Sequence, residues 1–433
     1  MDKIFFTAGE KLRYLRKKYN LTQEELVGKE KKDYYISKIE NGHRKLDYST
    51  ANIINNVINA KVQEIGVKTD VEVTIEWLMA DVKKQIKYIL KKYIMELNVN
   101  PSKEKIENVI TKIKELEKID KVEDYQIFRF FYCCFQYFKK NDLKIAREYL
   151  SKMQEITSRN KYILRELYVI KEMTYVNALL EKYEDIVIWG NISKTISKSK
   201  NVKFFMKKIE FNMVLAFYML KKFEICKEMI KYIENEYEFD EEEQFDIEIM
   251  KVNCLKVNKK YHQAEKVLDN LIKKTNDSYR SIMCINNIAE IKYLNNSKEA
   301  IGIIKKALTI EVPSDISFKV REAELLKNAL DIYIKFNYYS IEINNVFEKL
   351  YDITILLGDY KLMIKAISSM FNYYKMKNNL KGMRNLLYRL EKLEVNNSQK
   401  GILLCKIIMY LVLKDKTFEL SYDYYNIIEK IVI

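Results

Sequence analysis

A turn pattern that returns about every 40 residues is the feature of this chain that most restricts its fold. Short polar stretches such as EKYEDIV, KKFEICK and KKYHQAE each separate two segments with apolar residues at helical spacing. The residues that begin the second segment of each unit are spaced by 40, 40, 38, 36, 42, 41 and 38 positions. They are Leu143, Tyr183, Phe223, Tyr261, Ser297, Tyr339, Leu380 and Phe418. Two helices in every unit of nearly constant length predict a stack of helical hairpins.

The composition also favours an all-α fold. Only 2 prolines and 9 glycines punctuate 433 residues, of which 48% are hydrophobic and 32% are charged. Strand-rich folds need many more turn residues, so this balance favours long helices joined by short turns. A chain of this length is too long for one compact core, and we expect two or three domains.

Small side chains three residues after several of these positions support the hairpin interpretation. An aromatic or leucine residue followed one turn later by a small residue lets two helices approach closely. The small residues are Ala146, Cys226, Ala264, Ala300 and Ser421. The pattern resembles tetratricopeptide repeats in which both helices are lengthened by about one turn. The resemblance implies a right-handed α-solenoid of about eight hairpins over residues 101–433.

The first 66 residues lack this period and are predicted to form a separate small domain. The segment GEKLRYLRKKYNLTQEELVGKEKKDYYISKIENGHRKL, residues 9–46, resembles the XRE-type helix-turn-helix of bacterial repressors. In that resemblance the small core consists of Leu12, Leu15, Leu21, Leu26, Ile36 and Ile39. Between residues 67 and 100, helical spacing from about Glu76 to Leu97 predicts a connecting helix.

Local signals mark the ends of the second and third helices of this domain. Thr22 is placed to cap the second helix, with Glu25 three residues later in the capping-box position. Gly42 is placed to end the third helix in the left-handed conformation. The resemblance further implies an ion pair between Arg16 and Glu40, which we interpret as structural.

Two details distinguish this segment from common XRE-type domains. Leu26 to Ile36 is a step of ten, which makes the turn before the third helix one residue shorter, and Lys32 occupies the usual Ser/Thr cap position. Such a turn is familiar from the RRNPP peptide-pheromone receptors of Gram-positive bacteria, which, apart from the Rap branch, join this domain to degenerate tetratricopeptide repeats. The whole chain resembles that group, with a layout comparable to its NprR, PlcR and Rgg branches.

The resemblance implies a cytoplasmic quorum-sensing transcription regulator. Such a protein binds operator DNA as a homodimer, because one small helix-turn-helix reads only a half-site. The expected switch is a short signalling peptide bound in the concave face of the repeats. The repeat domain is then expected to serve both peptide binding and dimerisation.

Residues on and around the third helix are the candidates for DNA contact. Ile36 and Ile39 are expected to face inward, which leaves polar side chains outward. Outward residues near the start of a recognition helix reach base edges, and flanking residues contact phosphates. The candidates are Asp33, Tyr34, Ser37 and Lys38 on the helix, with Gln23, Asn41, His43 and Arg44 around it. The alternative is that they are ordinary solvated residues.

Asparagines at two fixed offsets are the candidates for peptide binding. Asn212, Asn286 and Asn328 lie eleven residues before the positions that begin second helices, and Asn253 and Asn372 lie eight before. Their amides offer both a donor and an acceptor to an extended backbone. Lys208 is a candidate partner for a peptide carboxylate, and Tyr175 and Tyr218 are candidates for side-chain pockets. The alternatives are a general bias towards asparagine and aromatic packing in the core.

The charge distribution favours polyanionic partners. The formal net charge is +15, and residues 1–62 contain 13 basic and 8 acidic residues, a net charge of +5. Residues 234–248 instead contain nine acidic residues and no basic one. We interpret this run as the start of a helix, where carboxylates suit the macrodipole. A docking site for a basic partner is the alternative.

Motifs for catalysis, cofactors and metals are missing from the sequence. The six cysteines show no CxxC spacing, and we expect them to be reduced and buried in a cytoplasmic protein. There is no glycine-rich phosphate loop, HExxH motif or nucleophile elbow. The most apolar stretch, residues 402–414, contains Lys406 and is shorter than the roughly 20 residues of a membrane span. We therefore expect no enzyme, no catalytic residue, no metal, no cofactor and no membrane contact.

Two other functions remain open. A Rap-like module could sequester or dephosphorylate a response regulator while its DNA-binding part is vestigial. A phage-encoded peptide receptor that controls lysis and lysogeny would share the chemistry of the first hypothesis and differ only in its genes' context.

Overall fold

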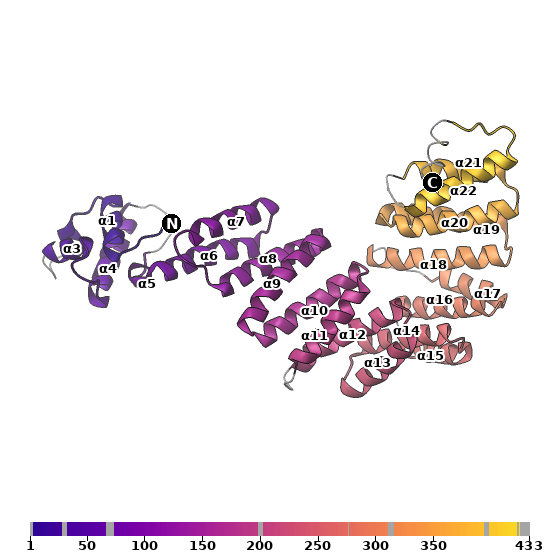
Figure 1. The fold of residues 1–433 in the computed structure, drawn as a ribbon, viewed down its shortest axis with the longest axis horizontal. Helices are drawn as coiled ribbons and strands as arrows, with labels where there is room; N and C mark the ends of the chain where they lie inside the picture. The colour runs from indigo at the N-terminus through magenta and orange to yellow at the C-terminus, as the bar shows by residue number, and fades with distance from the viewer. Residues whose placement is uncertain are drawn as a thin grey trace. The chain divides into compact units, whose positions relative to one another are not determined.

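The structure is a computed structural model that describes residues 3–27, 33–65, 73–197, 202–275, 277–310, 316–393, 398–421 and 424. Every regular element in these ranges is an α-helix, so the all-α prediction is confirmed (Figure 1). The chain divides into two compact units, Met1–Tyr237 and Glu238–Ile433. No helix among the described residues combines the length and the apolar character that a membrane span requires.

Four helices open the first unit and enclose a small core of their own. They are α1 (Ala8–Lys18), α2 (Gln23–Val27), α3 (Asp33–Glu40) and α4 (Tyr48–Ile65). The six core residues expected from the sequence are buried, together with Ala51, Ile54 and Ile58 of α4. The turn before α3, with Lys32, lies outside the described residues.

The predicted ends of α2 and α3 are confirmed. The Thr22 hydroxyl accepts the Glu25 amide at 3.1 Å, and the Glu25 carboxylate accepts the Thr22 amide at 2.6 Å. Gly42 has a φ of 77°, and the His43 amide bonds back to the Lys38 carbonyl at 2.8 Å. This return bond is the Schellman closure that a glycine in the left-handed region allows.

The segment between α4 and the hairpins forms two helices where we expected one. They are α5 (Ile75–Met79) and α6 (Val82–Val99), followed by α7 (Lys103–Glu117). The break has a local cause, because Asp81 has an extended backbone and its carboxylate accepts the Lys84 amide at 2.8 Å. The single connecting helix is therefore wrong in detail.

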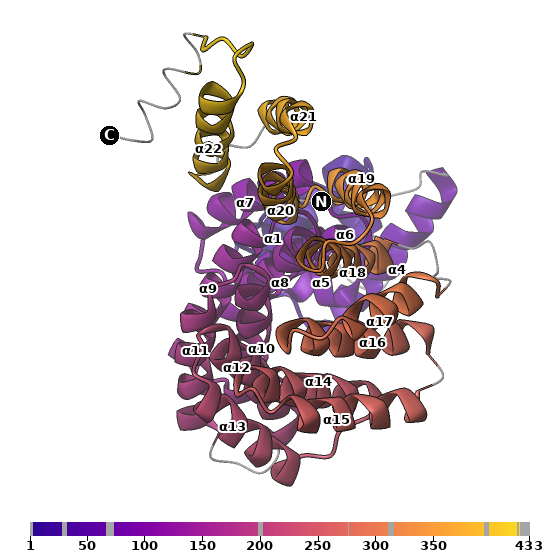
Figure 2. The same ribbon diagram turned by 90° about the vertical axis from the view of Figure 1, so that its right-hand side faces the viewer.

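Helical hairpins follow in both units. The first unit contains α8 (Asp124–Asn141), α9 (Leu143–Asn160), α10 (Ile163–Leu179), α11 (Tyr183–Ile196), α12 (Lys203–Met219) and α13 (Phe223–Glu236). The second contains α14 (Glu241–Val257), α15 (Tyr261–Lys274), α16 (Ser278–Leu294), α17 (Glu299–Leu308), α18 (Ile316–Lys335), α19 (Ser340–Leu357), α20 (Tyr360–Met376), α21 (Leu380–Glu391) and α22 (Ser398–Lys414). Figure 2 shows the successive hairpins α14–α15, α16–α17 and α18–α19 stacked in chain order. The described part thus has the tetratricopeptide-like arrangement that the repeat predicts.

The turns inside the hairpins repeat one geometry. Glu181, Lys221, Lys259, Asn296, Asn337 and Asn378 all have positive φ values between 50° and 61°. In each turn, the residue after the left-handed one donates its amide to the carbonyl of the residue five positions earlier. An example is the bond from the Lys222 amide to the Phe217 carbonyl at 2.8 Å. The second helix then starts within three residues, which explains the regular spacing in the sequence.

The small residues Ala146, Cys226, Ala264 and Ala300 are fully buried, as the hairpin interpretation requires. The predicted helix start at Phe418 is wrong, since Phe418 is not helical and Ser421 is exposed, and most of the predicted helix after Ser421 lies outside the described residues. Arg384 pairs with Asp415 at 2.7 Å and Asp415 also bonds Thr417, which fixes a turn after α22. From α8 to α21 the described ranges contain seven complete hairpins.

Candidate functional site

The third helix presents the outward face that the sequence predicts. Ile36 and Ile39 are buried, Tyr34 is 53% exposed, Lys38 is exposed and Ser37 is half-buried. The Lys38 ammonium lies 5.2 Å from the centre of the Tyr34 ring. Asp33 belongs to α3, but its side chain lies outside the described residues.

A buried carboxylate ties three helices together behind this face. Arg16 of α1 meets Glu40 of α3 at 3.0 Å, as the resemblance implies. The Gln23 amide nitrogen donates to the same carboxylate at 2.9 Å, and Arg13 donates to the Glu40 carbonyl at 3.1 Å. Gln23, a candidate for phosphate contact, therefore also has a structural bond that anchors the start of α2.

The segment after α3 is held in place while its polar groups face solvent. Asn41, His43 and Arg44 are exposed, and the Arg44 guanidinium stacks 3.9 Å from the centre of the Tyr35 ring. The Tyr35 hydroxyl donates to Asp47, and this bond, with the Thr50 amide, lowers the pKa of Asp47 far below its ordinary value. A cation on a rigid segment beside a recognition helix can bind a phosphate without first losing much conformational freedom.

An open hollow of about 710 Å³ adjoins the start of α2. Arg16, Lys17, Thr22 and Gln23 line it among others. The lining comes from the end of α1, the turn after it and the start of α2, and it contains two basic residues and one acidic residue, Glu24. The candidates Gln23, Tyr34, Ser37, Lys38, Asn41, His43 and Arg44 are thus gathered on one small domain.

Two buried polar side chains join this domain to the helices that follow it. Lys11 of α1 is 1% exposed and donates to the carbonyls of Trp77, Leu78 and Ala80 at 2.8, 3.2 and 2.5 Å. Burial lowers the pKa of Lys11 to about 8, partly offset by Asp81. We did not predict the role of Lys11 from the sequence, although a lysine one turn before Leu15 on an apolar face was a signal.

Gln85 of α6 makes the second connection. Its amide oxygen accepts the Phe5 amide at 3.0 Å, and its nitrogen donates to the Phe5 carbonyl at 2.8 Å and to the Ala80 carbonyl at 3.2 Å. Because Gln85 is 3% exposed, these bonds are shielded from water. The N-terminal domain is thereby attached to α6 by specific contacts.

The peptide-binding candidates fall into two groups, one in each unit. Lys208, Asn212, Tyr175 and Tyr218 lie on α10 and α12 of the first unit. The Asn212 amide nitrogen donates to the buried Thr174 hydroxyl at 3.0 Å, which places its oxygen beside α10. Tyr175 is 43% exposed, and Lys208 is exposed. This part of the set therefore lies on the first helices of successive hairpins.

The second unit brings two of its four candidate asparagines together. The Asn328 nitrogen on α18 donates to the Asn286 oxygen on α16 at 3.0 Å. One amide nitrogen and one amide oxygen of the pair are then left for other partners. Asn253 on α14 is half-buried and Asn372 on α20 is exposed, and among the described residues neither is hydrogen-bonded to the pair.

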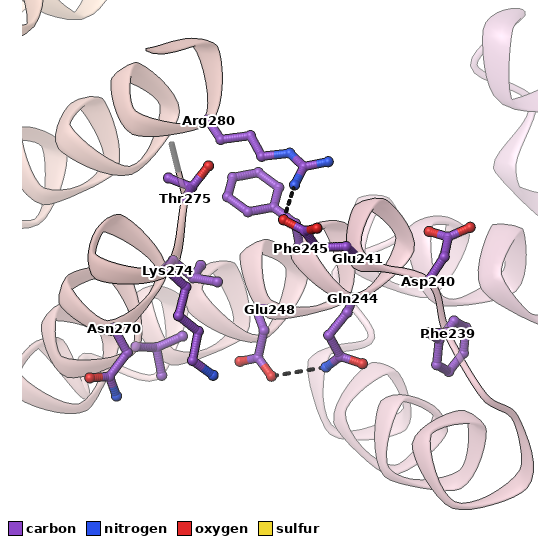
Figure 3. A pocket seen from close by; sticks show the side chains of 12 residues that line it. Phe239, Asp240, Glu241, Gln244, Phe245, Glu248, Asn270, Lys274, Thr275 and Arg280 are labelled. Atoms are coloured by element: carbon purple, nitrogen blue, oxygen red, sulfur yellow. Dashed lines mark hydrogen bonds and ion pairs between the residues drawn. The ribbon is translucent and has the colours of Figure 1, made fainter. Parts of the chain in front are cut away.

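The acidic stretch 234–248 contains the start of α14, as we interpreted it, although Glu234 and Glu236 lie in the last turn of α13. Asp240 and Glu243 form a capping box at the start of α14. A hollow of about 580 Å³ lies beside it, lined by α14, the end of α15 and Arg280 (Figure 3). Arg280 pairs with Glu241 at 3.1 Å and Gln244 donates to Glu248 at 3.2 Å, so its rim charges are largely paired. Nothing in the sequence indicated this hollow.

Comparison with known proteins identifies the N-terminal part. Residues 9–82 match the family model described as a helix-turn-helix domain. Residues 9–82 are a helix-turn-helix domain. In the described part of the chain this helix-turn-helix domain is followed by tetratricopeptide-like hairpins. No curated protein sequence matches the chain.

Solved structures are similar to the chain at low sequence identity. The apo form of the quorum sensor NprR from Bacillus thuringiensis is 14% identical, with a TM-score of 0.49 over 82% of this chain and 100% of that one. Bacillus thuringiensis PlcR in complex with the peptide PapR7 and DNA is 15% identical, with a TM-score of 0.36 over 82% and 98%. NprR in complex with its cognate peptide NprX is 15% identical, with a TM-score of 0.46 over 80% and 99%.

Proposed function

We propose that this protein is a cytoplasmic transcription regulator that binds operator DNA as a homodimer and is switched by a short signalling peptide. The observation that carries the proposal is the outward face of α3, with exposed Tyr34 and Lys38 above a core that is closed by buried Ile36 and Ile39. A recognition helix needs such polar groups, at the end that enters the major groove. Catalysis forms no part of the proposal.

Peptide binding is supported by the asparagines on the first helices. The Asn286–Asn328 pair leaves one donor and one acceptor, which match the carbonyl and the N–H of one extended peptide unit. Recognition of the backbone in this way is independent of peptide sequence, so neighbouring side-chain contacts have to supply selectivity. Asn212 offers its oxygen in the same manner in the first unit.

Salt dependence tests the DNA-binding part against the protein-binding alternative. We expect the chain to bind its own promoter DNA with an affinity that falls about a thousandfold between about 50 and 200 mM salt, because cations at several phosphates are displaced on binding. Fluorescence anisotropy with labelled promoter duplex measures this, with a shuffled duplex as the control. Equal, weak binding to both duplexes at all salt concentrations would contradict the proposal and favour a protein-binding role.

Calorimetric titration tests the peptide-binding part. Short peptides synthesised from reading frames next to the gene serve as probes. We expect the double variant Asn286→Ala and Asn328→Ala to bind the active peptide at least about tenfold more weakly, since two backbone hydrogen bonds are lost. Asn235→Ala, an exposed asparagine on α13, is the control and should leave the affinity unchanged. Unchanged binding by the double variant would remove the asparagine pair from the site.

A further inference from the structure

Arg165, in the first turn of α10, lies among three aromatic rings. Its guanidinium carbon is 4.7 Å from the centre of the Tyr125 ring, 4.8 Å from that of Tyr162 and 5.7 Å from that of Phe128. Tyr125 and Phe128 belong to α8, and Tyr162 directly precedes α10. Stacking on rings fixes the plane of a guanidinium and leaves its N–H groups, which lie in that plane, free to donate.

The carboxylates nearest to Arg165 in the sequence are engaged elsewhere. Glu166 is buried and accepts hydrogen bonds from Gln154 at 2.9 Å and from Ser158 at 2.7 Å. Asp124, beside Tyr125, accepts the Asn160 amide at 2.9 Å. Within the described ranges, the Arg165 side chain has no hydrogen bond and no ion pair.

Other cations on the same helices differ from Arg165 in this respect. Lys139 and Lys171 both meet the nearly buried Glu172 at 2.7 Å. Burial raises the pKa of Glu172, but the hydrogen bonds from these two lysines outweigh burial and lower it. The pair of lysines is therefore neutralised in part, whereas the charge on Arg165 is available to a ligand.

The surroundings of Arg165 are apolar and exposed. Tyr125 is 41% exposed, Tyr162 43%, Ile163 46% and Leu164 57%. Arg165 itself is half-buried, so fewer water molecules compete with a carboxylate for its guanidinium than in open water. The site therefore suits a ligand that combines a carboxylate with apolar side chains.

A row of contacts connects Arg165 to the proposed peptide site. Tyr132 of α8 meets Tyr168 of α10 with ring centres 6.0 Å apart, and further along Lys139 lies 4.6 Å from the Tyr175 ring. Thr174, next to Tyr175, holds Asn212 of α12. Arg165 and the exposed Tyr175 are ten residues apart on one helix, about 15 Å along its axis, which an extended peptide of about five residues spans.

We infer that Arg165 binds a carboxylate of the signalling peptide, in a bidentate pair, while the peptide runs along α10 towards Tyr175 and Asn212. The inference rests on the proposed peptide binding and adds the chemical class of the ligand. It predicts a peptide that has an acidic group at one end and an apolar residue over Tyr132 and Tyr168. The carboxylate is supplied either by the C-terminus or by an Asp or Glu side chain.

The test is selection from a synthetic pool of random heptapeptides by the full chain, with the bound peptides identified by mass spectrometry. We expect peptides with a terminal or near-terminal carboxylate to be enriched. Arg165→Gln should bind the best of them about 10- to 100-fold more weakly, and Arg165→Lys should lie between the two. Arg159→Gln, which removes an exposed charge from α9, should bind like the parent chain.

Modified peptides identify the group that Arg165 contacts. Amidation of the C-terminus, or Asp→Asn or Glu→Gln in the peptide, should weaken binding to the parent chain and leave binding to Arg165→Gln unchanged. The modification with this effect identifies the source of the carboxylate. Equal enrichment and affinity for the parent and for Arg165→Gln, with circular dichroism showing both folded, would overturn the inference but leave peptide binding intact. Failure of the parent chain to enrich any peptide would instead contradict peptide binding itself, and the inference with it.

Discussion

At the scale of single residues, Lys11 links α1 of the helix-turn-helix domain to the end of α5. Its ammonium donates to three carbonyls at the end of α5. Because the helix ends there, no further turn of the helix supplies these carbonyls with backbone N–H donors. Trp77 lies against it, with the ring centre 5.2 Å from the ammonium. Lys11 therefore stabilises both the end of α5 and the attachment of α1 to it.

Lys11→Met should lower the free energy of unfolding of the N-terminal region by about 1–3 kcal/mol, because buried carbonyls lose their donor. Unfolding in urea, followed by Trp77 fluorescence in a Trp189→Phe background, measures this locally. Lys17→Met, an exposed lysine on the same helix, is the control and should change little. A Lys11→Met chain as stable as the control would show that the carbonyls find other donors.

The same pair of chains has a predicted pH dependence. The pKa of Lys11 is lowered from 10.5 to about 8 in the fold, so between these values the unfolded chain binds the extra proton. The free energy of unfolding of the parent, relative to Lys11→Met, should therefore rise from pH 8 to pH 10.5 and stay constant below pH 8. If the free energy of unfolding of the parent, relative to Lys11→Met, fell between pH 8 and pH 10.5, the lowered pKa of Lys11 would be contradicted.

Single-residue predictions succeeded where the determining contact is local or part of a known motif. The Thr22–Glu25 box, the left-handed Gly42 and the Arg16–Glu40 pair are of this kind. Lys11 was missed because its partners lie more than 60 residues away in the chain. Arg165 was missed for the same reason, since two of its three rings come from a different helix.

At the scale of helices, the hairpin turns explain both the period and a cost in stability. Each left-handed turn residue with a side chain is strained relative to glycine by about 1 kcal/mol. Five of the seven predicted second-helix starts up to Leu380 coincide with the observed ones, and the other two, Ser297 and Tyr339, lie within two residues. The turn chemistry is contained in a few consecutive residues, so the sequence was sufficient.

Lys221→Gly should raise the melting temperature of the first unit by about 2–4 °C, because glycine adopts a φ of 59° without strain. Thermal unfolding followed by circular dichroism at 222 nm measures it. Lys231→Gly places the same substitution in the exposed middle of α13 and should lower the melting temperature by a similar amount. Destabilisation by both substitutions would mean that the Lys221 side chain makes contacts that outweigh the strain.

The last unit shows where local reasoning failed. The spacing places a helix start at Phe418, but Arg384 of α21 holds Asp415 and thereby the turn around it. The break between α5 and α6 was visible in principle, because Asp81 is a favourable cap followed by a helical segment. The turn near Phe418 could not be predicted locally, because it depends on a contact from another helix. The break between α5 and α6 could have been predicted from the capping residue alone.

At the scale of the whole molecule, the helical fold and the order of its parts could be predicted from composition, period and one motif. The sequence could not predict which candidate residues share a surface, because that depends on the stacking of helices about 40 residues apart. The structure pairs Asn286 with Asn328 and joins Asn212 to Thr174. It also adds Arg165, which provides the proposed peptide site with a charge, and Lys11 and Gln85, which connect the N-terminal helix-turn-helix region to α5 and α6.

The central claim is that α3 reads DNA, and selection from a random duplex library by the full chain tests it most directly. The parent chain should enrich a site with two-fold symmetry, since two copies each read one half-site. The variant Tyr34→Ala with Ser37→Ala should enrich no such site, while Tyr388→Ala, an equally exposed tyrosine beside a lysine on α21, should enrich the parent's site. Enrichment of no site by the parent, or of the same site by the α3 variant, would contradict the account.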